Sequence, residues 1–457
     1  MADQRPLPEE ARAFLQSNDS VGNIDLLITD ANGIVRGKRI RRDVLCKVYE
    51  KGVCLPGSVF GCDICGDTVE ATGLGFDRGD SDDICYPVPG TLSLTGWRSG
   101  ADAQLIMSMF EADGTPFFAD PRQVLNRVLE RLQADGLEPT IAVELEFYLL
   151  DRRCAESGDP RPPVSPVTGE RESSTQVYGM AELDGYSEFL DEVHRLCTIQ
   201  GVPADTAVAE YAPGQYEINL HHVADALAAC DQATLLKRII KRAAERFGMD
   251  ATFMAKPYAD RSGSGTHIHV SMLDGDGGNI FEDADPEGSA RLKHAVGGLL
   301  DAMPESMAIL APNANSFRRF QPGNFVPMTP CWGVNNRTTA LRIPAGDPPA
   351  RRIEHRVAGA DANPYLVVAA VLAGMHHGMS QGLQPPPALE GDAAAAETGT
   401  LPPSWLHAIE ALEQGTVLPG YLGADFVRVF AACRRHERQS FEAGVTPLEI
   451  DWYLRTV

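Results

Sequence analysis

The sequence has no excess of positive charge. Its 457 residues include 40 Lys and Arg against 63 Asp and Glu, which gives a formal net charge of −23. Proteins that bind a nucleic-acid backbone need a basic surface, so this composition argues against nucleic acid as a partner. The acidic chain instead favours cationic partners, such as metal ions or protonated amines.

Long apolar runs and dense cysteine patterns are also missing. The longest apolar stretch, 365–375, is shorter than the ~20 residues that cross a bilayer, and no apolar core of a secretory signal follows Met1. The single CxxC, at Cys62 and Cys65, has no second pair and is a poor zinc or redox site. We therefore expect a cytoplasmic protein with reduced thiols and no membrane segment.

The order of strand and helix patterns predicts an α+β fold. Strands at 24–29 and 34–40 flank the hairpin signal Asn32-Gly33, and another strand follows at 104–110. Asp120-Pro121 is a typical start for a helix, here ending near Ala134. Beyond it the pattern predicts strands at 140–150, 206–211, 215–221 and 265–273, and helices at 185–200, 224–247 and 364–382.

The turn residues at 113–116 separate these two regions. We expect a small N-terminal β domain over 18–112 and a large C-terminal domain over 116–457, with an antiparallel sheet and helices. Residues 384–400 are rich in Pro, Ala and Gly and predict a surface loop before the closing helices.

Two glutamates share one face of a predicted strand. Glu144 and Glu146 stand two residues apart in an otherwise apolar segment, and alternate side chains of a strand point the same way. Adjacent carboxylates repel unless something neutralises them, and a divalent cation would do so. An exposed strand face produces the same alternation, so these two residues alone leave both readings open.

Further acids and histidines follow in short motifs. Glu210 and Glu217 lie on either side of a Pro-Gly turn, and His267 and His269 share a strand face behind a Gly-rich turn. Carboxylate oxygens with some imidazole suit Mg²⁺ or Mn²⁺ rather than zinc. Four arginines complete the set needed to position and stabilise a transferring phosphoryl group, although each alone fits an ordinary surface residue: Arg319, Arg337, Arg342 and Arg356.

These motifs, taken in order, resemble the glutamine synthetase superfamily of the bacterial class I type over nearly the whole chain. The segments that carry the resemblance are 143–147, 212–217, 263–269, 335–338, 341–344, 351–354 and 361–365. The resemblance implies a β-grasp N-terminal domain, a catalytic domain of antiparallel strands, ATP as co-substrate and two or more Mg²⁺ or Mn²⁺ ions per site. It also implies a dodecamer of two hexameric rings with active sites between subunits.

The same resemblance implies a role for each matching residue. One metal site is matched by Glu146, Glu210 and Glu217, and a second by Glu144, His267 and Glu354. Arg319, Ser262 and Gly263 match glutamate-side positions, whereas His269, Ser271, Arg342 and Arg352 match nucleotide-side positions. Arg337 and Arg356 match the arginines that stabilise phosphoryl transfer to γ-glutamyl phosphate, which an amine then attacks.

Two positions depart from the ammonia-using members. Phe325 stands where they place an acid on a flap, and Pro56 stands where they place an aspartate that reaches the neighbouring subunit. A phenylalanine lines a pocket for a carbon chain but does not attract ammonium as a carboxylate does. We therefore expect an organic amine as the nucleophile. The segments 251–257, 318–320 and 359–364 resemble the γ-glutamylpolyamine (γ-glutamylputrescine) synthetase branch, which opens polyamine or monoamine catabolism by coupling glutamate to putrescine or another organic amine.

Several points stay open at this stage. An ordinary glutamine synthetase that uses ammonia and an inactive structural or regulatory relative are the alternatives. The family often has Asn at the position of Ser262, and serine still donates and accepts a hydrogen bond. The candidates for the general base are Glu210 and Asp63. Asp63 and Asp67 fit two readings equally: they hold the distal ammonium group of a diamine, or they are solvated acids of a loop.

Overall fold

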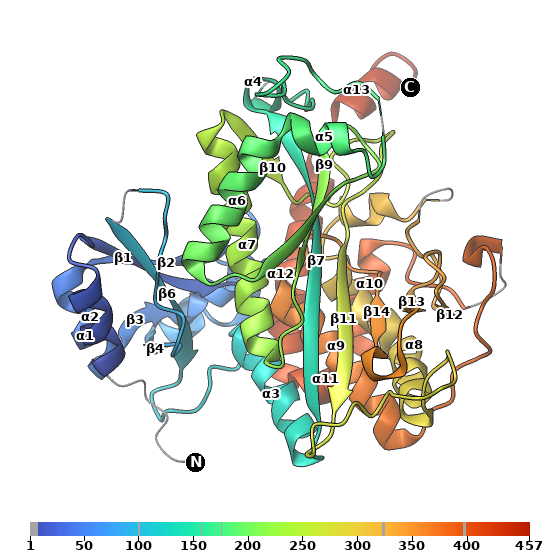
Figure 1. Ribbon diagram of the computed structural model, residues 1–457, viewed down its shortest axis with the longest axis horizontal. Coiled ribbons are helices and arrows are strands. Elements are labelled where there is room, and N and C mark those ends of the chain that lie inside the picture. The colour runs from blue at the N-terminus through green and yellow to red at the C-terminus, as the bar shows by residue number, and fades with distance from the viewer. Residues whose placement is uncertain (1–7, 99–100, 157, 175, 322–324, 396–398) are drawn as a thin grey trace.

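The computed structural model describes residues 8–98, 101–156, 158–174, 176–321, 325–395 and 399–457. In this part of the chain the strands form a six-stranded N-terminal sheet and an eight-stranded C-terminal sheet, and Figure 1 shows the two sheets side by side with most helices around the second. The predicted α+β fold is confirmed. No helix of the described residues is long and apolar enough to cross a membrane.

The N-terminal sheet has the strand order β2-β1-β6-β4-β3, with β5 paired to β6. β1 and β6 run parallel and the other neighbours antiparallel. Gly33, at φ 75°, turns the predicted hairpin between β1 and β2. The elements are α1 (Pro8–Ser17), β1 (Asn23–Thr29), β2 (Val35–Arg41), α2 (Leu45–Lys51), β3 (Val53–Pro56), β4 (Asp82–Pro87), β5 (Ser93–Leu94) and β6 (Asp102–Phe110).

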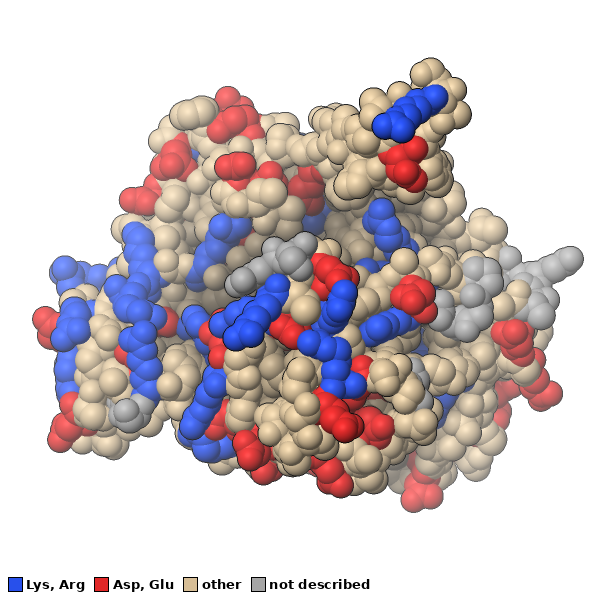
Figure 2. All heavy atoms as spheres, turned by 90° about the horizontal axis from the view of Figure 1, so that it is seen from above, with Lys and Arg blue, Asp and Glu red and all other residues tan. Residues whose placement is uncertain are grey.

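This sheet also carries a basic edge that the net charge does not suggest. β2 ends the sheet and has four basic residues, Arg36, Lys38, Arg39 and Arg41, that are exposed or half-buried. Figure 2 shows Lys and Arg side chains gathered over the N-terminal sheet at the left of that view. The excess of acidic residues therefore lies away from this edge strand.

The C-terminal sheet has the order β12-β13-β14-β11-β7-β9-β8, with β10 also paired to β7. β12 and β13 are parallel, whereas the other described neighbours run antiparallel. The strands are β7 (Glu138–Asp151), β8 (Ala204–Ala209), β9 (Gln215–Leu220), β10 (Met249–Thr252), β11 (Thr266–Leu273), β12 (Trp332–Val334), β13 (Leu341–Ile343) and β14 (Ile353–His355).

Helices pack around this sheet, and their first residues explain where they begin. Asp120, Asp225 and Asn363 each accept hydrogen bonds from backbone N–H groups of the first turn. The helices are α3 (Pro121–Ala134), α4 (Arg152–Glu156), α5 (Met180–Gly185), α6 (Ser187–Gln200), α7 (Ala226–Arg246), α8 (Ala290–Leu310), α9 (Pro364–Gln381), α10 (Trp405–Gln414), α11 (Leu418–Leu422), α12 (Ala424–Ala443) and α13 (Pro447–Tyr453).

The structure confirms the strands and helices predicted above to within a few residues, but it adds others. Helix α8 was not predicted, because Gly297, Gly298 and Pro304 read as helix breakers. The structure uses Gly298 for close helix packing: a Cβ there would collide with the backbone of α9 at Gly374 and Gly378. The short strands β12 to β14 were also missed, because three-residue strands show no clear alternation.

The buried side chain of Asn363 joins helix α9 to the N-terminal hairpin. Asn363, 3% exposed, caps α9 through Tyr365 and Leu366 and also donates a 2.8 Å hydrogen bond to the carbonyl of Asp30 in the N-terminal hairpin. Because the same amide performs both functions, the start of α9 and the hairpin are held together.

Replacing Asn363 by Ala should therefore cost more than the loss of an ordinary cap. We expect about 2–4 kcal/mol from the lost cap and the unsatisfied Asp30 carbonyl, against about 1 kcal/mol for Asp225→Ala, an exposed cap. Urea unfolding of both variants measures the difference. Equal costs would show that the link to the hairpin contributes nothing.

Candidate active site

Strand register brings the predicted metal-binding residues together. In the neighbouring strands β9, β7, β11 and β14, Glu217 pairs with Glu146, and His267 pairs with Glu144. In the adjacent pair of β11 and β14, His269 pairs with Glu354. Side chains of directly paired residues lie on the same face of a sheet, so these groups converge on one surface.

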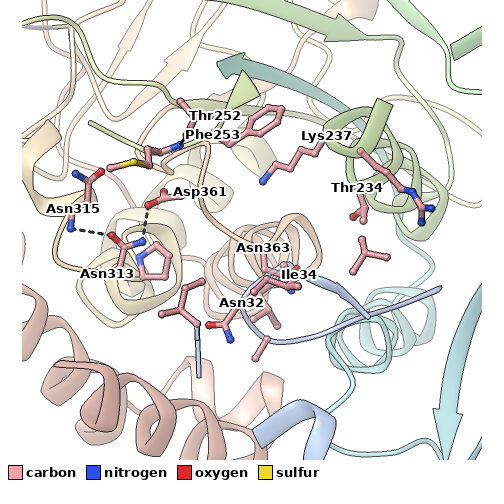
Figure 3. Close-up of a pocket in the computed structure, with 18 of the residues that line it drawn as sticks. Asn32, Ile34, Thr234, Lys237, Thr252, Phe253, Asn313, Asn315, Asp361 and Asn363 are labelled. Atoms are coloured by element: carbon pink, nitrogen blue, oxygen red, sulfur yellow. Dashed lines mark hydrogen bonds between the residues drawn. The ribbon is translucent and has the colours of Figure 1, made fainter. Parts of the chain in front are cut away.

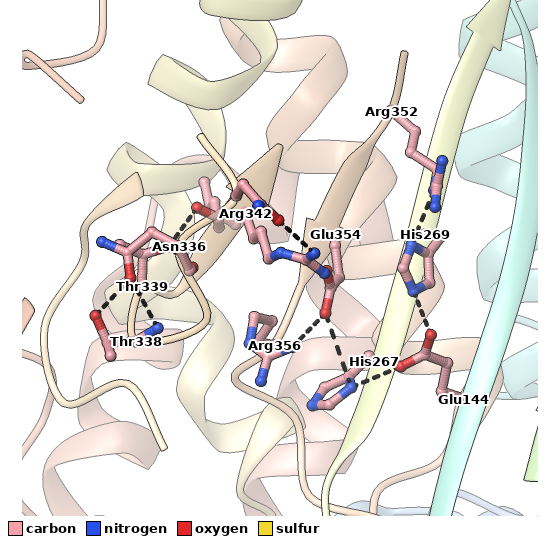
Figure 4. A network of polar contacts seen from close by, with 12 residues as sticks. Glu144, His267, His269, Asn336, Thr338, Thr339, Arg342, Arg352, Glu354 and Arg356 are labelled. Carbon is pink, nitrogen blue, oxygen red and sulfur yellow. Dashed lines mark hydrogen bonds and ion pairs between the residues drawn. The ribbon is translucent and has the colours of Figure 1, made fainter. Parts of the chain in front are cut away.

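Glu144 lies at the centre of this surface. Its two oxygens each lie 2.8 Å from a histidine, one from His267 Nδ1 and the other from His269 Nε2 (Figure 4). Both histidines are buried, at 8% and 5% exposed. The predicted pair of histidines on one strand face therefore shares a single carboxylate.

An arginine cluster lies on the β13 and β14 side of the same surface. Glu354, 1% exposed, accepts hydrogen bonds from Arg342, at 2.6 Å, and from Arg356. Arg352 donates to His269 at 3.2 Å. Figure 4 shows these arginines and histidines around Glu144 and Glu354. Positive charge is thus gathered on one side of the carboxylates.

The carboxylates of this surface have pKa values shifted in opposite directions. Burial, together with Glu144, Glu146 and Glu210, raises the pKa of Glu217 from its ordinary 4.5 to about 9. Burial and Glu146 raise the pKa of Glu210 to about 7. For Glu354, burial acts in the same direction, but Arg356 and the histidines outweigh it and lower the pKa to about 2.

The donor set fits divalent metal ions. Two groups of side chains have ligand atoms within 4.8 Å of one another: Glu144, Glu217 and His267 form one, and Glu144, His269 and Glu354 form the other. Oxygen ligands with some imidazole suit Mg²⁺ or Mn²⁺, and a cation would relieve the repulsion that raises the pKa of Glu217.

These groups differ from the two predicted triads. Glu144 belongs to both groups because it accepts from both histidines, and His269, predicted on the nucleotide side, lies with Glu144 and Glu354. Glu146 instead accepts from the backbone N–H of Gly265 at 2.8 Å. The assignment of individual ligands to two metal ions therefore stays a proposal.

The residues predicted to bind glutamate lie close to Glu146. Arg319 is 3% exposed, burial lowers its pKa, and it donates to the Val357 carbonyl at 3.1 Å. Its side chain fills the space beside Gly263, where a Cβ would lie 2.6 Å from Arg319 Cγ. Ser262 donates to Gln215 Oε1 at 2.5 Å. Gln215 thus holds the side chain of Ser262 in place. This residue was not among the predicted site residues, and only its position within the motif 212–217 indicated a role.

The remaining predicted residues lie at the edges of the carboxylate surface. Arg337 is exposed, and its charge opposes the rise in the pKa of half-buried Glu210. Ser271 donates to the carbonyl of Arg351 at 3.2 Å. Phe325 is 55% exposed, and its ring lies 6.0 Å from that of Tyr211, the residue after Glu210. Residues 322–324 of the predicted flap lie outside the described residues.

The acids suggested for the amine lie away from this surface within one chain. Asp63 is 5% exposed and accepts hydrogen bonds from the backbone N–H groups of Cys65 and Asp67 in its own turn. Its other oxygen lies 3.7 Å from His436 of α12. A role for Asp63 in the reaction would require a second subunit.

Comparison with known proteins agrees with this arrangement. The profile "Glutamine synthetase, catalytic domain" matches residues 118–453. The γ-glutamylputrescine synthetase PuuA of Escherichia coli (strain K12) is 45% identical over 98% of this chain and 94% of its own length. The γ-glutamylethanolamide synthetase GlnA4 of Streptomyces coelicolor is 32% identical over 98% and 94%. The solved structure "Apo GmaS without ligand" has a TM-score of 0.85 and 28% identity, and covers 100% of both chains.

The chain therefore belongs to the glutamine synthetase family, as the ordered motifs predicted. Membership implies the use of ATP and of divalent metal ions, which is consistent with the carboxylate and histidine groups on the sheet.

Metal binding should stabilise the protein through Glu217. Because its folded-state pKa is raised from 4.5 to about 9, ionisation of Glu217 opposes folding, and the metal-free protein should lose stability as pH rises through this range. At 100 times its Kd, Mn²⁺ should add about 2.7 kcal/mol. Thermal unfolding at pH 8 with Mn²⁺ or with a chelator measures this gain.

Glu217→Gln should raise the stability of the metal-free protein and lose most of the gain with Mn²⁺. The control is Glu138→Gln, at an exposed position of the neighbouring strand β7. This variant should behave as the unchanged protein does. An undiminished gain in Glu217→Gln would show that Glu217 binds no metal.

Proposed function

We propose that this protein is an ATP-dependent ligase that couples glutamate to an organic amine, a polyamine such as putrescine or a monoamine, to give a γ-glutamylamide. The γ-carboxylate of glutamate accepts the terminal phosphoryl group of ATP, and the amine then displaces phosphate from γ-glutamyl phosphate. The observation that carries the proposal is the single sheet face on which buried carboxylates meet a cluster of arginines.

Each half of this face suits one part of the reaction. We propose that Glu144, Glu146, Glu210, Glu217, His267 and Glu354 hold two or more Mg²⁺ or Mn²⁺ ions. When bound, such ions neutralise the phosphate oxygens and help to position the reacting groups. Arg337 and Arg356 would stabilise the charge of the transferring group, and Arg342, Arg352, His269 and Ser271 would lie on the nucleotide side.

The glutamate end would lie at Arg319. Its buried guanidinium suits a carboxylate, because a buried charge is stabilised by an opposite charge. Ser262 and Gly263 lie beside it, and Tyr148 donates to the Ser262 carbonyl at 2.7 Å, which fixes this turn. Glu210, half-buried between Glu146 and Tyr211, is the proposed acceptor of the amine's proton.

The amine end supports an organic amine over ammonia. Phe325 and Tyr211 present two half-exposed rings next to Glu210, and a pair of aromatic rings suits an alkyl chain and a protonated amine. Pro56, at the end of edge strand β3, offers no charge to a neighbouring site. The 45% identity to a γ-glutamylputrescine synthetase supports the same conclusion.

Phosphate release with glutamate, ATP and a panel of amines tests this specificity. Putrescine or another organic amine should support faster turnover than ammonia at equal concentration. Phe325→Ala should raise the KM for the amine about tenfold, the effect of about 1.4 kcal/mol of lost contact, and leave the KM for ATP unchanged. Met328→Ala, in the same segment, is the matched control. Ammonia outperforming every organic amine would contradict the proposal, and no turnover with any amine would favour an inactive relative.

We also propose that the protein assembles as a dodecamer of two hexameric rings, with domains over 18–112 and 116–457. The C-terminal helix α13 supports assembly, because it buries none of its residues and exposes several large apolar side chains at the top of the molecule in Figure 1. An exposed apolar surface of this kind is typical of a protein interface. These side chains are Leu448, Ile450, Trp452 and Tyr453, and the neighbouring Val445 and Leu454 are exposed as well.

Charging this helix should break the assembly. Leu448→Asp with Trp452→Asp should reduce the mass measured by light scattering from that of the full oligomer to that of a smaller species, because a carboxylate in an apolar interface is costly. Asp451→Ala, on the same helix, should leave the mass unchanged. Full-size particles from the doubly charged variant would exclude α13 from the contact.

A further inference from the structure

One large cavity among the described residues lies away from the carboxylate face. It measures about 790 Å³ and is bordered by the N-terminal hairpin at Asn32 and Ile34, by helix α7, and by the loops around Asn313 and Asp361 (Figure 3). A volume of this size suits a small organic ligand. None of the residues to which we assign a role in catalysis or metal binding lines it.

The arginines around this cavity are paired with carboxylates. Each of the three that line it forms an ion pair, and Asp25, the partner of Arg238, also pairs with Arg39 at 2.6 Å. These pairs are Arg238 with Asp25 at 2.8 Å, Arg242 with Glu245 at 2.7 Å, and Arg434 with Glu437 at 2.8 Å.

Two lysines differ from the arginines. Lys237 and Lys241 form no ion pair with any carboxylate of the described residues, and both ammonium groups lie over the ring of Phe253, at 5.5 and 5.8 Å from its centroid. Figure 3 shows Lys237 extending from α7 into the cavity towards Asp361. Burial lowers the pKa of Lys237 to about 7, the effect expected of an ammonium group that lacks a counter-ion.

The hydrogen bonds of Lys237 are incomplete. Its Nζ donates to the carbonyls of Ala360 and Ala362, at 2.7 and 2.9 Å, whereas an ammonium group has three donors. The third has no acceptor among the described residues. Asp361, the remaining unpaired acid of the cavity, directs Oδ2 to Asn313 and Ser316 and forms no ion pair with either lysine.

The charges that remain define the ligand. Among the lining residues that form no ion pair, two lysines against Asp361 leave one net positive charge, and much of the remaining wall is apolar, with Ile34, Phe253, Met254, Ile309 and Leu366. We propose that this cavity binds an organic acid with one carboxylate and an apolar body, that Lys237 and Lys241 hold the carboxylate, and that the ligand acts from there on the glutamate end of the active site.

The connection runs through one segment, 357–363. On the cavity side Lys237 holds its carbonyls at Ala360 and Ala362. On the other side Ala360 N–H donates to Ser264 at 3.0 Å, and Arg319 donates to Val357. A carboxylate beside Lys237 would keep the ammonium charged and this segment fixed, so the affinity for glutamate should rise. This last step rests on the proposed function, whereas binding to the cavity does not.

Titration calorimetry with 4-phenylbutyrate as the probe tests the site on the full-length protein. The acid should bind, and its neutral counterpart 4-phenylbutanamide should bind at least about tenfold more weakly, because a hydrogen bond to a charged group contributes about 1.5–3 kcal/mol. Lys241→Met and Lys237→Met should each weaken the binding of the acid by a similar factor. Lys47→Met, an exposed lysine of α2, is the matched control.

Because Lys241 is exposed, we expect Lys241→Met to fold, so this variant tests the site even if Lys237→Met fails to fold. No binding of the acid, equal binding of the amide, or binding that survives Lys241→Met would overturn the site. A change in oligomer mass caused by Lys241→Met would also overturn it, because a subunit contact would then cover the cavity.

The effect on the active site has its own measurement. Saturating 4-phenylbutyrate should lower the KM for glutamate about fivefold, a typical coupling between two sites, and leave the KM for ATP unchanged. The same addition to Lys241→Met should have no effect. Binding with an unchanged KM for glutamate would overturn the coupling, and since calorimetry needs no turnover, its result stands even if the proposed reaction fails.

Discussion

Mutual repulsion between buried carboxylates is the constraint on which the rest of this structure depends. Glu144, Glu146, Glu210 and Glu217 converge on one face of the C-terminal sheet, and their repulsion adds to burial in raising the pKa values of Glu210 and Glu217. A fold keeps such a group only if cations offset its charge. Here two histidines and an arginine cluster do so on one side, and metal ions would do so on the other.

The register of four strands produces this arrangement with few residues. β9, β7, β11 and β14 place their site residues in direct pairs across the sheet, and helix α7, which also contacts α9, packs against β7. Charge is distributed unevenly across the face: arginines gather on the proposed phosphate side, and Glu210 lies with two aromatic rings on the proposed amine side. Arg319, packed against Gly263 and Gly265, lies at the proposed glutamate end.

Sequence motifs predicted most of this site, because strand periodicity fixes which side chains share a face. Glu144 with Glu146 and His267 with His269 followed directly from that rule. The sharing of Glu144 between both histidines did not, because it depends on which strands are neighbours. Helix α8 and the cavity beside Lys237 also escaped prediction: close glycine packing and unpaired charge between distant segments leave no local pattern.

The most direct test of the central claim follows the oxygen of glutamate. The protein would be given ATP, Mg²⁺, glutamate labelled with ¹⁸O in its γ-carboxylate, and equal amounts of ammonia and putrescine, with a parallel mixture containing monoamines. Mass spectrometry of the products should find a γ-glutamylamide of an organic amine and one ¹⁸O atom in the released phosphate. Glutamine as the main product, or phosphate without label, would contradict the account.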